Sequence, residues 1–76
     1  MRMSRGRMTA VHTEQIETII LGVLKSADRR SAGAAAKTAA RKIGITNILD
    51  LSEIATYAEE EWLAANPHAT RDQRKY

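Results

Sequence analysis

The 76-residue sequence contains no cysteine and no phenylalanine, and its aromatic residues are limited to one tryptophan and two tyrosines. The absence of cysteine excludes disulfide bonds and thiolate metal sites and gives no mark of an oxidising compartment, so we expect a cytoplasmic protein. With few large side chains, thirteen alanines must fill much of the core, which favours closely packed helices. A domain of this size hides only about 60% of its unfolded surface, so self-association would add stability.

Long hydrophobic runs are also absent. No segment reaches the roughly 18 apolar residues that a membrane-spanning helix needs. The N-terminus carries three arginines, as the start of a signal peptide does, but Thr13, Glu14 and Glu17 interrupt any apolar segment after it. We therefore expect residues 1–12 to form a flexible basic arm, and we expect no membrane partner.

Positive and negative charges are segregated along the chain. Residues 1–43 contain nine basic and three acidic side chains, whereas residues 44–66 contain five acidic side chains and no Lys or Arg. The last ten residues are basic again, and the formal net charge is +3. This distribution predicts surfaces of opposite sign that meet within the molecule, in a second copy or in a partner.

The spacing of apolar residues predicts an all-α fold, with a single three-helix domain over residues 13–66 and a short basic tail over residues 67–76. The first helix is expected over residues 14–28, where apolar side chains recur every three or four positions, at Ile16, Ile19, Ile20, Val23, Leu24 and Ala27. The second is expected over residues 31–43, and it is alanine-rich, with one side formed by Ala32, Ala35, Ala36, Ala39 and Ile43.

The third helix is expected over residues 47–65 and must stop at Asn66 and Pro67. Its apolar positions are Ile48, Leu51, Ile54, Ala55, Ala58, Trp62 and Ala65. We expect Trp62 to be the largest buried side chain. Leu21, Leu49 and Leu63 fall outside the apolar faces, which predicts unburied hydrophobic surface and self-association.

Polar residues mark the expected helix starts. Thr13 is expected to cap the first helix, Ser31 the second and Thr46 the third, with Asp50 as an alternative start for the third. A first helix that continues straight through Ser31 is a further alternative. Gly44 suits the left-handed position that follows a helix, and Ile45 is expected to fold back onto the end of the second helix.

An acidic face is the most distinctive feature of the third helix. Helical spacing places five side chains on one side of it, namely Asp50, Glu53, Tyr57, Glu60 and Glu61. Tyr57 is a residue type that often anchors protein interfaces, so this face is the candidate site for a protein partner with a basic surface. The alternative is a solvated face that the basic residues of the molecule balance. An exposed helix face cannot supply the desolvated cleft that paired catalytic carboxylates need.

Catalytic, cofactor and metal sites are not expected. His12 with Glu14, and His68 alone, match neither the His-x-x-x-His spacing nor the Glu and Glu-x-x-His set of metal sites in helical bundles. The four glycines never form a phosphate-binding loop. No small-molecule substrate is therefore expected.

Nucleic-acid binding is the alternative function, because the sequence pI is about 9.7 and the second helix is basic. The residues that would contact phosphates are Arg29, Arg30, Lys37, Arg41 and Lys42. Residues 39–45 resemble the first helix and turn of a helix-turn-helix motif. The resemblance then fails, because the following helix carries Asp50 and Glu53 and no basic residue to approach DNA.

These patterns predict a non-catalytic helical module that binds another protein through its helix faces and self-associates. A chain this small can alter another molecule only by occupying or reshaping a surface. Adapters and small inhibitors of the kind that phages encode meet this constraint.

Overall fold

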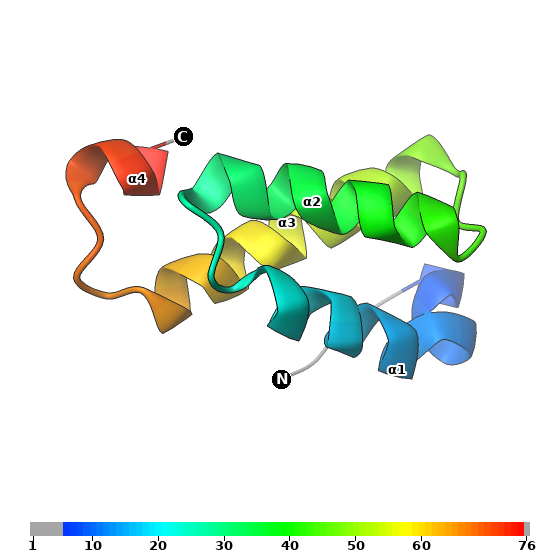
Figure 1. The fold of residues 1–76 in the computed structure, drawn as a ribbon. Helices are drawn as coiled ribbons and strands as arrows, with labels where there is room; N and C mark the ends of the chain where they lie inside the picture. The colour runs from blue at the N-terminus through cyan, green and yellow to red at the C-terminus, as the bar shows by residue number, and fades with distance from the viewer. Residues whose placement is uncertain (1–5, 76) are drawn as a thin grey trace.

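The computed structural model describes the backbone of residues 6–75 and the side chains of residues 14–75. This part of the chain forms four helices and no strand: α1 (Gly6–Val23), α2 (Arg29–Lys42), α3 (Ile48–Ala65) and α4 (Arg71–Lys75). The three long helices pack side by side, and the short α4 lies at one end of the bundle, beside the start of α2 (Figure 1). The predicted all-α, three-helix core is confirmed.

Helix α1 is longer at its start and shorter at its end than predicted. It begins at Gly6, inside the segment expected to be a flexible arm, and residues 1–5 of that arm lie outside the described residues. Thr13 therefore lies within the helix and does not cap it. The helix ends at Val23, where the Ser26 amide donates to the Val23 carbonyl at 3.1 Å, and Ala27 is exposed beyond it.

Helix α2 is separate from α1, as predicted, but its cap is not Ser31. The side chain of Asp28 accepts a hydrogen bond from the Ser31 amide at 2.7 Å, so Asp28 caps a helix that starts at Arg29. Aspartate and serine are both favoured at the N-cap position. Because Asp28 is the cap, the helix begins earlier than predicted. The hydrogen bonds from Ser31 hold the pKa of Asp28 below its usual value.

The turn between α2 and α3 follows the predicted geometry. Gly44 has φ of +96°, the left-handed conformation that favours glycine. The Ile45 amide donates to the Ala40 carbonyl at 3.1 Å, and the Ile45 side chain is buried. Asn47, not Thr46 or Asp50, caps α3: its Oδ1 accepts from the amides of Leu49 and Asp50 at 2.9 and 3.1 Å.

The core lies between the three long helices, and Trp62 is its largest buried side chain, as predicted. Its fully or nearly fully buried members are Ile16, Ile20, Val23, Ala32, Ala36, Ala40, Ile45, Leu51, Ile54, Ala58 and Trp62. Several positions assigned to the apolar faces are exposed instead, namely Ala35, Ile43, Ile48 and Ala65. Leu63, expected to be off the apolar face, is half-buried against the core, whereas Leu21 and Leu49 are exposed as predicted.

Helices α2 and α3 approach each other closely at Gly33. A Cβ at this position would lie 3.3 Å from the Ala55 carbonyl oxygen and 2.7 Å from a carboxylate oxygen of Glu59. The close crossing that the small residues predicted is therefore at Gly33, and Gly22 of α1 has open space around it.

Side chains from α3 and its cap close the connection between α1 and α2. The Trp62 indole Nε1 donates to the Ser26 carbonyl at 3.0 Å. Asn66 Nδ2 donates to the Leu24 carbonyl at 3.2 Å and to the Trp62 carbonyl at 2.8 Å. These hydrogen bonds attach the α1–α2 connection to α3 and provide donors for the backbone carbonyls of Ser26 and Leu24.

The C-terminal tail, predicted only as a short basic segment, docks on the same connection through α4. Gln73 Nε2 donates to the Ala27 carbonyl at 3.2 Å, and Arg29 Nη2 donates to the Lys75 carbonyl at 2.8 Å. These long-range bonds hold α4 beside the start of α2.

Candidate protein-binding face

The acidic face is built on α3, which runs without interruption from Ile48 to Ala65. This helix brings together all five residues assigned to the face, Asp50, Glu53, Tyr57, Glu60 and Glu61, on the side away from buried Leu51 and Ala58. Glu53 and Glu60 are exposed, and the other three are half-buried. The sequence of α3 contains no Lys or Arg, so no cation of this helix neutralises the face.

Tyr57 belongs partly to the core rather than standing free on the acidic face. It packs against the buried cluster, and its hydroxyl is buried without a hydrogen bond in the described structure. Burial, followed by the charges of Glu61 and Glu17, raises the pKa of Tyr57 above its usual value. Because Glu17 belongs to α1, the Tyr57 ring lies on the α1 side of α3. Only part of its side chain remains exposed to a partner.

Glu59 differs from its neighbours because it faces α2. Its Oε1 lies 4.0 Å from Arg29 Nε, and its side chain lies against Gly33. Both partners are about one third exposed, so this pair contributes modestly to stability. The Arg29–Glu59 pair lies where acidic α3 and basic α2 meet within the molecule. Glu59 thus has a partner on α2, whereas its neighbour Glu60 is exposed.

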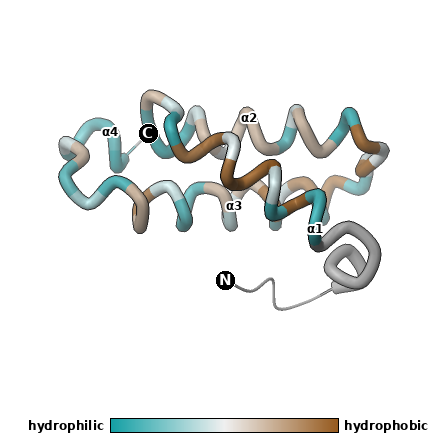
Figure 2. Tube along the Cα trace, turned by 60° about the horizontal axis from the view of Figure 1, so that its bottom comes forward, coloured by the Kyte–Doolittle hydropathy of each residue, from teal (hydrophilic) through white to brown (hydrophobic). Residues whose placement is uncertain are grey.

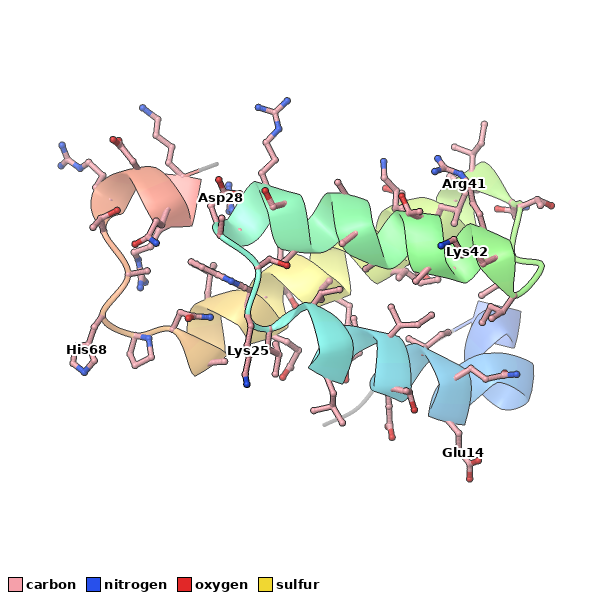
Figure 3. The ribbon with its side chains drawn as sticks, viewed as in Figure 1. Glu14, Lys25, Asp28, Arg41, Lys42 and His68 are labelled. Atoms are coloured by element: carbon pink, nitrogen blue, oxygen red, sulfur yellow. The ribbon has the colours of Figure 1, made fainter. Side chains whose placement is uncertain are left out.

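The basic residues assigned to nucleic-acid binding do not form one patch. Arg29 is half-buried and engaged with Glu59 and with the carbonyl of Lys75. Arg41 and Lys42 are exposed at the opposite end of α2 (Figure 3). Arg30 is exposed and Lys37 is half-buried.

A second group of basic residues, on α4, lies near Arg29 at the start of α2. The sequence did not predict that these residues are neighbours. Arg71, Arg74 and Lys75 of α4 line a shallow, open hollow. The side-chain bonds that dock α4 bring these residues beside α2. No local sequence pattern indicates this proximity, because the bonded residues are 46 positions apart.

A metal centre does not emerge from the described side chains, among which no three His, Asp or Glu residues gather. His68 and Glu14 point away from the bundle at distant places (Figure 3), and the side chain of His12 lies outside the described residues. Within the same part of the chain, no helix has the length and apolar character needed to cross a membrane.

Comparison with models of protein families, with curated proteins and with solved structures found no match. The chain's own surface is therefore the basis for inferring its function. The two surfaces with distinct chemistry are the acidic face of α3 and the divided basic residues of α2 and α4.

Proposed function

We propose that this protein is a non-catalytic binding module whose acidic face on α3 docks onto a basic surface of a partner protein. The observation that carries the proposal is the exposure of Glu53 and Glu60 on a helix with no basic residue. Like charges kept together on one face repel one another weakly in the free protein. A partner with complementary charge relieves that repulsion and is drawn in by the field of the face.

The described charge pairing between α2 and α3 leaves Glu53 and Glu60 of this face exposed. Where α2 and α3 meet, Arg29 engages Glu59, which lies toward α2. Glu60, the next residue of α3, is exposed, and the ion pair at that junction is made by Glu59. Tyr57 is half-buried, so the exposed part of its side chain supplies apolar contact within a charged surface.

The module acts by occupying a surface, in the manner of an adapter or inhibitor, and we place it in the cytoplasm because its sequence carries no cysteine. Glu53 and Glu60 of α3 are exposed to solvent, whereas paired catalytic carboxylates work in a desolvated cleft.

The proposal is tested with the double variant Glu60→Lys/Glu61→Lys used as bait in a lysate of the source organism, with and without nuclease. We expect the variant to lose capture of the partner that the wild-type protein retains after nuclease. The matched control is Glu14→Lys/Asp72→Lys, which makes the same change in net charge at exposed positions elsewhere. Equal capture by both variants and the wild type would contradict the proposal, provided that circular dichroism shows each to be folded.

Sequence-independent binding of nucleic acid is the second candidate, favoured by the exposure of Arg30, Arg41 and Lys42. For this function, replacing Lys37, Arg41 and Lys42 by Gln should weaken binding to unrelated duplexes equally. It should also reduce the slope of log K against log salt by about 0.9 per lost phosphate contact. A wild-type protein that fails to shift duplex or single-stranded DNA at low salt would exclude this candidate.

A further inference from the structure

The turn between α2 and α3 presents an apolar patch to solvent. Among the side chains that the structure describes, the large hydrophobic ones left exposed are Leu21, Ile43, Ile48 and Leu49, at 64%, 37%, 80% and 68%. Three of these four lie within seven residues of one another, around the turn whose hydrophobic colouring is visible in Figure 2. Ile45 from the same turn already fills the core, so the other three are not needed there.

Charges of opposite sign flank this turn patch, which we define as Ile43, Ile48 and Leu49. On the α2 side, exposed Arg41 and Lys42 lie at the end of the helix (Figure 3). On the α3 side, exposed Glu53 follows Leu49 by four residues and so lies on the same side of the helix. The patch therefore has an apolar centre, a basic edge and an acidic edge.

We propose that the turn patch is the contact surface for a second copy of this chain in a two-fold symmetric dimer. A two-fold axis in the interface pairs each point with its mirror position across the axis. When the axis runs between the basic and acidic edges, Arg41 and Lys42 of one copy face Glu53 of the other, and the reverse contact forms as well. The apolar centres of the two copies then pack against each other. The surface is therefore complementary to a second copy of itself in both charge and hydrophobicity.

This inference goes beyond the proposed function, because it needs no other protein and uses a different surface. Glu53 is a member of the acidic face and also forms the acidic edge beside the turn patch. For that reason Glu53 is left out of the double variant that tests partner binding. Interfaces that bury less than about 1,200 Å² are weak, so self-association should be measured over roughly 10 to 500 µM. Sedimentation equilibrium over this range should show wild-type chains passing from 8.4 kDa monomer toward dimer.

The first test compares Ile48→Ser/Leu49→Ser with Leu21→Ser. Leu21 is an equally exposed leucine on α1, which makes it a matched control for general surface hydrophobicity. We expect the double variant to weaken dimerisation at least tenfold and the control to change it less than twofold. A wild-type monomer throughout the range, or an equal or larger loss in the control, would overturn the inference.

The second test exchanges the charges and does not rely on the apolar variant. Arg41→Glu/Lys42→Glu should weaken its own dimer at least fivefold, and so should Glu53→Lys, because like charges then meet at both edges. An equimolar mixture of these two variants brings opposite charges together at both edges, so it should recover wild-type affinity within about twofold. A mixture that associates no better than its components would overturn the proposed pairing.

The two proposals fail in different ways. Loss of the dimer in Ile48→Ser/Leu49→Ser, with partner capture unaffected by Glu60→Lys/Glu61→Lys, supports the dimer and contradicts the acidic-face proposal. A strictly monomeric protein whose capture of the partner depends on Glu60 and Glu61 supports the acidic-face proposal and contradicts the dimer.

Discussion

Trp62 serves the fold in two ways, because it is the largest buried side chain of an alanine-rich core and also binds the α1–α2 connection. It is 1% exposed, and its indole nitrogen donates to the Ser26 carbonyl. Trp62→Ala should reduce the free energy of unfolding by about 3 to 5 kcal/mol, which is most of the stability of a domain this small. Urea denaturation followed by circular dichroism measures the loss. Trp62→Phe keeps most of the apolar volume, so a loss as large as that of the alanine variant would contradict the assigned role in packing.

Tyr57 carries a polar group that has no hydrogen-bond partner among the described residues. Its hydroxyl is buried without a hydrogen bond in the described structure, so Tyr57→Phe should leave stability at pH 7 unchanged or raise it by up to about 1 kcal/mol. The folded state raises the pKa of Tyr57 above the usual 10.0, because burial and the charges of Glu61 and Glu17 oppose the phenolate.

The direction of this pKa change predicts how stability responds to alkali. A raised pKa means that the folded state favours the neutral phenol, so the contribution is complete below pH 10 and is lost as pH rises through the folded pKa. The wild-type protein should therefore lose stability more steeply above pH 10 than Tyr57→Phe does. Thermal melting at several pH values measures both proteins under conditions where their other groups titrate alike. Parallel curves would show that the hydroxyl is solvated.

Two glycines in helices α1 and α2 provide an internal comparison of element packing. Gly22 is exposed with open space around it, so Gly22→Ala should stabilise the protein by about 0.5 kcal/mol through helix propensity. At Gly33 the same change must displace the Glu59 side chain from Arg29 and press on the Ala55 carbonyl. Gly33→Ala should therefore be at least about 1 kcal/mol less stable than Gly22→Ala. Equal stabilisation by both changes, measured by urea denaturation, would show that α2 and α3 can separate there without cost.

The helices could be predicted where local periodicity decides their position, and α2 and α3 end within one residue of the predicted positions, but the bounds of α1 and the start of α2 could not be predicted. Asp28 and Ser31 are both capping residues three positions apart, and only the preference for a longer α2 selects Asp28. Helix α4 has no apolar periodicity of its own, so its position could not be predicted. Long-range bonds, such as that from Gln73 to the Ala27 carbonyl, hold it in place. Ile48 fits the periodicity of α3 but is the first residue of that helix and is exposed.

The composition of the acidic face follows from helical spacing, but the environment of each residue depends on neighbouring helices. Spacing alone places Glu53 and Glu60 on the outer side of α3. The burial of Tyr57 depends on where α1 crosses, and the engagement of Glu59 depends on the absence of a side chain at Gly33. Contacts between helices far apart in sequence carry this information, and a one-dimensional pattern does not.

At the scale of the whole molecule, charge is organised by the ends of the bundle as well as by its faces. One end holds α4, the start of α2 and the basic residues Arg71 and Arg74. The other end holds the turn patch with Arg41 and Lys42 beside it. The acidic outer side of α3 runs between these ends. A dimer through the turn patch would leave Glu60 and Glu61 uncovered, so two acidic faces would be available to partners at once, which raises avidity.

Dimerisation should be visible in the thermal stability of the wild-type protein. A partner that binds only the folded chain stabilises it by mass action, so the melting temperature of a dimer rises with protein concentration. Above the dissociation constant, each tenfold increase in concentration adds about 0.7 kcal/mol per chain, or roughly 3 to 5 °C for a domain of this size. Ile48→Ser/Leu49→Ser should melt at the same temperature at all concentrations, while Leu21→Ser should follow the wild type. Because Ile48 and Leu49 are exposed in the single chain, the double variant should match the wild type at the lowest concentration, and a lower melting temperature there would place these side chains in the monomer core instead.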